Sequence, residues 1–292
     1  MKGMILIMKK CISYLGVFVL VCFSFFYTDK AVEIVKRNDP VMKEILTISD
    51  SLKIDPINAI INDDEVISGL NGKKINIDKS YQNMKKLNMY KESMLVFDEI
   101  LPEVSINYDK YVIKGNELKN EVALVFKVDS IDNIKLINKV LTEKNTLATF
   151  FIDGNIVKDN MNLVLELAHD GYEIENLGYN GNYSSEKLTW TNNMIESLTN
   201  KKTNYCYTEF KDKNILELCS TNKMYTIKPT INTGNYPFLT IKKNLESGSI
   251  ISFDLSDKTL KELPSIISYI SQKGYNIVSL EQLISENYSD EK

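Results

Sequence analysis

The chain has 292 residues and a net charge of −4, and its length favours about two domains. Its composition, 43% hydrophobic and 25% charged, is ordinary for a globular protein and excludes disordered, collagen-like and coiled-coil chains. The acidic balance argues against a dedicated nucleic-acid binder, which usually carries a basic face. The single histidine, His169, excludes any mechanism or metal site that needs two histidines.

The amino terminus has the layout of a signal peptide or signal anchor. Lys2, Lys9 and Lys10 precede an uncharged, largely apolar stretch from Cys11 to Tyr27, about as short as a membrane-spanning helix can be. Because no Ala-x-Ala cleavage pattern follows, we predict an uncleaved anchor within residues 1–28, with the lysines on the cytoplasmic side. A cleaved secretory signal is the alternative, and either leaves the remainder extracytoplasmic. The abundance of Lys, Asn and Ile is typical of an AT-rich bacterial genome, which indicates the cell envelope.

Residues 29–118 predict a helix followed by a small α+β module. The helix covers 29–53, with Pro40 as a break or a new first turn. A second helix is expected over 78–87 with Asp78 as its N-cap, and Asn71-Gly72 predicts a hairpin turn. Nothing in this module has catalytic spacing. Its β-like runs are 59–61, 65–67, 73–77, 94–100 and 108–113.

Residues 119–286 predict strands that alternate with helices. The strands are apolar with little alternation, which is typical of a parallel sheet covered by helices. About seven repeats predict a distorted (β/α) barrel, an α/β fold whose sites lie at the carboxyl ends of the strands. The expected strands are 122–128, 148–152, 172–176, 205–207, 224–227, 249–253 and 276–279, and the expected helices are 131–144, 160–170, 191–201, 211–221, 239–246 and 263–273.

Several of these segments resemble the polysaccharide deacetylase family, also called the NodB-homology domain or carbohydrate esterase family 4. The resemblance covers about 121–285 and implies a barrel of the NodB-homology type. It also implies an activity that removes acetyl groups from polysaccharides such as peptidoglycan. The matching segments are 122–126 (VALVF), 147–152 (LATFFI), 171–176 (GYEIEN), 248–251 (GSII), 263–267 (LPSII) and 273–280 (KGYNIVSL).

The family's chemistry uses a divalent metal, usually zinc, held by one aspartate and two histidines, with a second aspartate as base and a histidine as acid. The family's first strand ends in D-D-G, which here reads Lys127-Val128-Asp129. Lys127 therefore takes the position of the base and Val128 that of the metal aspartate. The two histidine positions are occupied by Leu177 and Gly181.

The remaining motifs are also replaced. The family's arginine, which orients the base, corresponds to Cys206, and its acid histidine corresponds to Asp254. The family's acidic strand motif aligns with 229–236, in which uncharged residues replace every acidic residue of the motif. We therefore predict a pseudoenzyme with no metal cofactor, membrane-anchored in the envelope, that binds cell-wall glycan or an envelope protein. An active N-deacetylase with a rebuilt site is the alternative.

Strand-end acids are the candidates for a rebuilt metal site. Asp129, Asp153, Glu175 and Asp254 follow or end strands, and an all-oxygen site would suit magnesium or calcium better than zinc. We expect instead that Lys127 pairs with Asp254, while Val128 and Leu177 fill the metal's space. His169 lies at a helix carboxyl terminus, which the helix dipole favours and which faces away from the strand ends.

Two further groups of residues are less specific. Cys206 and Cys219 are the only cysteines beyond the anchor; they could pair, but a strand residue and a helix-end residue are seldom close enough, so we predict separate buried thiols. Four aromatic residues near strand ends could stack on sugar rings, although core packing explains them equally well. These glycan-binding candidates are Tyr179, Tyr183, Trp190 and Tyr236.

Overall fold

The computed structural model describes residues 2–288 and divides into two compact units. The smaller unit contains the residues up to Asp55 together with Gly72–Ile100, and the larger contains Pro56–Asn71 and the chain from Leu101 onward. The sequence placed one boundary at residue 118. The structure divides the chain differently because strands β1 (Ile60–Asn62), β2 (Glu65–Ile67) and β5 (Tyr111–Lys114) hydrogen-bond into the larger unit's sheet.

The smaller unit combines helices with one antiparallel hairpin. Asp39 caps the second helix by accepting a hydrogen bond from the Val41 amide, and Pro40 occupies its first position. Pro40 therefore starts a new helix rather than kinking one. Val41, Ile45, Ile75 and Met84 form the core. The elements are α1 (Lys2–Asn38), α2 (Pro40–Ser49), α3 (Ile77–Lys85), a 3₁₀ turn (Glu92–Met94), β3 (Gly72–Ile75) and β4 (Phe97–Ile100).

Two local predictions for residues 29–118 are wrong. The N-cap of α3 is Asn76, whose side chain accepts from the Lys79 amide, whereas Asp78 pairs with Lys36. The tight hairpin turn lies at Asp63-Asp64 between β1 and β2, not at Asn71-Gly72. Asp63 adopts a φ of 54°, and aspartate tolerates this left-handed conformation better than most residues.

Within the described residues, one helix is long and apolar enough to cross a membrane. It covers Tyr14–Asn38, and its apolar window has a mean hydropathy of 1.6 with none of it buried. A cleaved signal sequence has the same properties, so this helix is compatible with both alternatives for the amino terminus.

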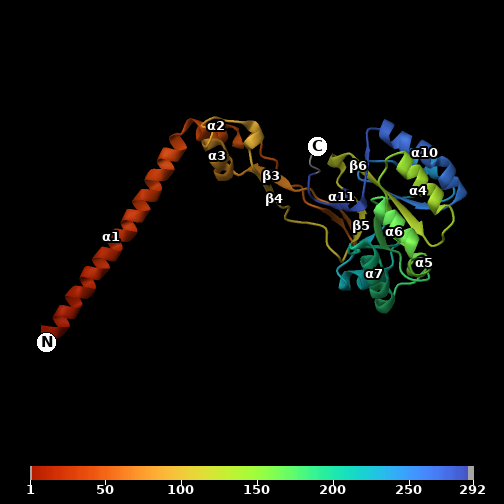
Figure 1. The fold of residues 1–292 in the computed structure, drawn as a ribbon, viewed down its shortest axis with the longest axis horizontal. Helices are drawn as coiled ribbons and strands as arrows, with labels where there is room; N and C mark the ends of the chain where they lie inside the picture. The colour runs from red at the N-terminus through yellow and green to blue at the C-terminus, as the bar shows by residue number, and fades with distance from the viewer. Residues whose placement is uncertain (1, 289–292) are drawn as a thin grey trace. The chain divides into compact units, whose positions relative to one another are not determined.

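The larger unit is built on a curled, mainly parallel sheet, shown in Figure 1 with its covering helices. The strand order is β1-β2-β5-β10-β9-β8-β7-β6-β12-β11, and β13 also pairs with β6. Among the described strands of this sheet, β1 and β2 are the one pair that runs antiparallel. The remaining strands are β6 (Glu121–Val128), β7 (Thr149–Ile152), β8 (Glu173–Asn176), β9 (Tyr205–Tyr207), β10 (Tyr225–Ile227), β11 (Ile231–Asn232), β12 (Ile250–Asp254) and β13 (Asn276–Val278).

The helices of the larger unit confirm the predicted alternation with strands. The helices that begin at Ser185 and Asp257 start six residues earlier than expected. Their N-caps are Ser184 and Ser256, whose side chains accept hydrogen bonds from backbone amides. Pro264, placed by the sequence in a first turn, lies inside the later helix. The elements are a 3₁₀ turn (Glu117–Lys119), α4 (Ile134–Glu143), α5 (Gly154–Asp159), α6 (Met161–His169), α7 (Ser185–Thr199), α8 (Lys213–Thr221), α9 (Pro237–Asn244), α10 (Asp257–Gln272) and α11 (Leu280–Ile284).

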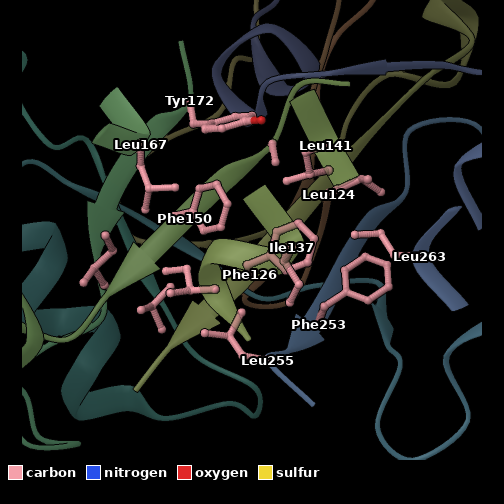
Figure 2. Close-up of a cluster of buried hydrophobic side chains, with 14 of the residues drawn as sticks. Leu124, Phe126, Ile137, Leu141, Phe150, Leu167, Tyr172, Phe253, Leu255 and Leu263 are labelled. Atoms are coloured by element: carbon pink, nitrogen blue, oxygen red, sulfur yellow. The ribbon is translucent and has the colours of Figure 1, made fainter. Parts of the chain in front are cut away.

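The main core lies between the sheet and its helices. Phe126 stacks between Phe150 and Phe253, with ring centroids 5.3 and 5.1 Å apart, and Figure 2 shows these rings facing Ile137 and Leu263 of the helices. Alternate residues on the same strands point to the other, concave face, where Val125 and Phe151 pack in a second cluster. This alternation places Lys127 on the concave side, at the carboxyl end of β6.

Cys206 and Cys219 form a disulfide, which corrects the prediction of separate thiols. Helix α8 returns along β9 and β10, so its last turn brings Cys219 to a Cα distance of 6.4 Å from Cys206. Both cysteines are fully buried beside Leu188 and Met224. Disulfides persist mainly in oxidising compartments.

We expect the disulfide to form in the purified protein and to stabilise it. The double variant Cys206→Ser/Cys219→Ser should lose up to about 3 kcal/mol of unfolding free energy, because the closed loop is short. Chemical denaturation measures the loss, and peptide mass spectrometry without reductant identifies the bond. Alkylation of Cys206 and Cys219 themselves in the unfolded, unreduced protein would contradict the pairing.

Candidate functional site

The candidate site is the mouth of the sheet, which we define by Lys127, Glu209 and Asp254 at the carboxyl ends of β6, β9 and β12. Strands β6 and β12 pair in parallel with Asp254 directly opposite Lys127, so both side chains leave the sheet on the same face. Glu209 lies two residues beyond the end of β9. The backbone pairing therefore brings together residues separated by 127 positions along the chain.

The three side chains form one ion-paired triad. The Lys127 Nζ lies 2.7 Å from Asp254 Oδ1 and also contacts Glu209 Oε1. Burial alone would lower the pKa of Lys127, but hydrogen bonds to the two carboxylates outweigh it, so its pKa is raised. The predicted pairing of Lys127 with Asp254 is confirmed. Glu209 was not predicted from the sequence as part of the site. Its position two residues after Tyr207, whose side chain lies on the concave face, could have indicated that it faces the same side.

The residues at the family's metal positions offer no ligand side chains. Leu177 packs against the concave cluster, whereas Val128 belongs to the helix-side cluster, because adjacent strand residues point to opposite faces. The expectation that both fill one space is therefore wrong. Gly181 has a φ of 69° and donates its amide to Asp153 Oδ2 at 2.9 Å.

The acids proposed for a rebuilt metal site are not gathered. Asp153 accepts amides from Asn155 and Asn180 as well as Gly181, which makes it a buried loop anchor. Glu175 accepts amides at the start of β9, away from the mouth. Among the described residues no group of three His, Cys, Asp or Glu side chains could hold a metal. The donor set therefore does not fit the family's metal, and an ammonium group lies at the mouth.

His169 ends α6 with its side chain 91% exposed beside Asp170. This agrees with a position away from the mouth and with the favourable placement of a histidine near a helix carboxyl terminus.

Three of the four aromatic candidates are packed against other side chains. Tyr183 is partly buried; its hydroxyl donates to the Asn176 carbonyl at 3.0 Å and accepts from the Tyr207 amide at 3.1 Å. Tyr179 and Trp190 meet edge to face with ring centroids 5.3 Å apart. The hydroxyl of Tyr183 is therefore engaged in hydrogen bonds to the backbone inside the fold.

Two aromatic rings remain exposed next to the strand ends. Tyr236 is 66% exposed, with the Lys258 ammonium 4.8 Å from its ring centroid. Phe210 is 75% exposed and directly follows Glu209 of the triad. Exposed single aromatics are common on protein surfaces, so these two are singled out by their positions after strand ends and not by their exposure. Phe210 was not singled out from the sequence.

A second group of perturbed acids lies at the other end of the concave face. Glu173 Oε2 accepts a hydrogen bond from Thr149 Oγ1 at 2.5 Å and from the Leu280 amide at 3.0 Å, which ties β8 to the start of α11. Burial raises the pKa of Glu173 to about 6, despite these hydrogen bonds. Burial and the nearby Glu173 raise the pKa of Glu175 as well.

The raised pKa of Glu173 predicts a pH-dependent stability. The folded state holds this proton more tightly than the unfolded chain, so stability present near pH 4.5 is lost as the pH rises through about 6. The loss attributable to Glu173 is about 2 kcal/mol. The variant Glu173→Gln should become more stable relative to wild type by this amount between pH 4 and pH 7, measured by urea unfolding. A difference that does not change with pH would contradict the raised pKa.

The triad predicts measurable coupling between its members. In a double-mutant cycle, Lys127→Met and Asp254→Asn should interact by about 0.5–1.5 kcal/mol, because removing either partner leaves the other partly buried. Urea unfolding provides the free energies. The exposed pair Lys139–Glu143, with Lys139→Met and Glu143→Gln, is the control and should stay below about 0.5 kcal/mol. Strictly additive effects at Lys127 and Asp254 would remove the claim that they act as a pair.

Comparisons with known proteins agree with this fold. Residues 114–214 match the polysaccharide deacetylase family. The chain is 28% identical over 279 residues to the uncharacterized protein YlxY of Bacillus subtilis strain 168, covering 87% of this chain and 86% of that protein.

Solved structures of carbohydrate esterase family 4 are also similar to this chain. The wild-type protein BA3943 of Bacillus anthracis, described as a CE4 family pseudoenzyme, superposes with a TM-score of 0.66 at 26% identity, covering 87% of this chain and 98% of that chain. A peptidoglycan N-acetylglucosamine deacetylase, Bc1960, superposes with a TM-score of 0.55 at 20% identity, covering 61% of this chain and 94% of that chain. The larger unit therefore contains a NodB-homology domain of the polysaccharide deacetylase family, carbohydrate esterase family 4.

Proposed function

We propose that this protein is a catalytically inactive relative of the polysaccharide deacetylases that binds a cell-wall glycan in the bacterial envelope. The observation that carries the proposal is the Lys127 triad. It occupies the family's base and acid positions, and the metal positions Val128, Leu177 and Gly181 carry no donor side chain.

Energetics supports an inactive site. Enzymes lower reaction barriers by at least about 8 kcal/mol, and in this family a bound metal and a free carboxylate base supply much of that. Here the base position is a lysine held by two carboxylates, which keep it protonated. A protonated amine cannot accept a proton from water, so Lys127 does not replace the base.

The exposed aromatics support glycan binding. Phe210 directly follows Glu209 of the triad, and the exposed ring of Tyr236 lies beside the Lys258 ammonium. An aromatic ring with charged neighbours suits a sugar, which has both C–H faces and hydroxyl groups. BA3943 is itself described as a pseudoenzyme, and Bc1960 as a deacetylase of peptidoglycan. These relatives favour a cell-wall glycan over a protein partner as the ligand.

The amino-terminal helix and the disulfide support an extracytoplasmic location. A helix long enough to span a membrane begins the smaller unit, and the Cys206–Cys219 bond suits an oxidising compartment. We propose that α1 remains as an anchor and holds both units on the outer face of the cell membrane.

The full chain in detergent should bind peptidoglycan fragments or chitooligosaccharides without releasing acetate and without one equivalent of zinc. Binding is measured by calorimetry, acetate by an enzymatic assay and zinc by elemental analysis.

Because the two exposed rings face solvent, Phe210→Ala/Tyr236→Ala should weaken binding about tenfold or more without loss of stability. The control Leu118→Ala/Leu147→Ala removes exposed apolar side chains that precede β6 and β7, at the opposite ends of these strands, and should bind normally. Chelator-sensitive turnover would establish the alternative, an active N-deacetylase.

The anchor proposal predicts that the protein stays in the membrane fraction. It should be released by detergent but not by high salt, and its mass should include the apolar stretch from Cys11 to Tyr27. A chain that starts at Asp29 is the control and should be recovered in the aqueous fraction. A mature protein that begins near Thr28 or Asp29 would show cleavage instead.

A further inference from the structure

The triad at the mouth carries one negative charge in excess. Two carboxylates, Glu209 and Asp254, share the single ammonium of Lys127. In the described part of the chain, the second oxygens, Glu209 Oε2 and Asp254 Oδ2, make no hydrogen bond. The two acids are 36% and 51% exposed, so these oxygens can accept from a ligand.

The charges around the triad do not cancel this excess. Asp129, two residues beyond Lys127, is exposed and adds a further negative charge. The nearby lysines are already engaged: Lys211 pairs with Asp64 and Glu65, and Lys258 contacts the Asn235 carbonyl and the Tyr236 ring. Asp257 accepts from the Asn133 side chain and offsets Lys258. The mouth is therefore complementary to a cation.

The same groups have the hydrogen-bonding capacity that a sugar requires. An ammonium has three donors, and Lys127 uses two of them, which leaves one for a sugar oxygen. The free carboxylate oxygens accept from hydroxyl or ammonium groups, and a charged donor makes the stronger bond. Phe210, which directly follows Glu209, supplies one exposed ring, and Tyr236 supplies another on the loop after β11, the strand that pairs with β12.

Wall glycans differ in the charge they would bring to this mouth. An N-acetylated hexosamine is neutral, and lactyl or phosphate groups are anions that the excess carboxylate repels. A hexosamine with an unsubstituted nitrogen is protonated below the pKa of an aliphatic amine and is positive. We infer that the mouth selects amino sugars whose nitrogen is free and protonated, and that it therefore binds the deacetylated form of a glycan in preference to the acetylated form. This inference rests on the proposed glycan binding.

The test compares triglucosamine with tri-N-acetylchitotriose for the full chain in detergent at about pH 6. Calorimetry should give a dissociation constant about tenfold lower for triglucosamine, with a difference that shrinks as salt is added. The variant Glu209→Gln/Asp254→Asn should abolish the difference. The control Glu143→Gln/Glu217→Gln removes the same charge from α4 and α8 and should keep it. Trilysine, a cation without a sugar, should bind at least about tenfold more weakly than triglucosamine.

The outcomes separate this inference from the proposed function. Equal binding of the two sugars, or tighter binding of the acetylated one, overturns selection of the free amine but leaves glycan binding intact. Trilysine binding as tightly as triglucosamine overturns the inference, because the mouth would then respond to charge alone. Binding of neither sugar removes both proposals. Circular dichroism and thermal unfolding of each variant identify any loss that is due to misfolding.

Discussion

The pairing of one ammonium with two carboxylates at the mouth is the interaction on which the functional interpretation depends. Removing a divalent cation from a partly buried site would leave nearby carboxylates without a counter-charge, which is costly. Lys127 supplies this counter-charge, and it does so from the strand position that the family resemblance assigns to the base. The cation at the mouth of this structure is a side chain of the protein itself, and it lies at the position that the resemblance assigns to the general base.

The scaffold around the mouth is retained for reasons independent of catalysis. Phe126, Phe150 and Phe253 pack between sheet and helices, and their burial supports the strands that carry Lys127 and Asp254. Asp153 fixes the loop that holds Gly181 by accepting its amide. The packing and the loop contacts therefore hold the strand ends in place whichever side chains stand at the family's catalytic positions.

Attachments at the opposite end of the sheet also connect distant parts of the chain. Glu173 ties β8 to α11, and the buried Lys119 pairs with Glu121 while donating to the Gln282 and Ser285 carbonyls. Burial of charged groups requires such partners: Gln282 donates to Glu121 Oε1, while among the described residues Glu121 Oε2 has only the ion pair with Lys119 at 3.4 Å. The carboxyl-terminal helix is thus part of the larger unit's core, and the mouth lies on a rigid support.

The sequence alone determined the alternation of strands and helices, the NodB-type fold and the residues at the family's metal positions, Val128, Leu177 and Gly181, because apolar periodicity and motif positions are local properties. It also predicted that Lys127 meets Asp254, since both end strands of one parallel sheet. Only the tertiary structure decided that Glu209 joins them and that Cys206 bonds Cys219. It likewise decided that 56–71 joins the larger unit. These contacts depend on how loops return and which strands pair, and no periodic pattern in the chain records that.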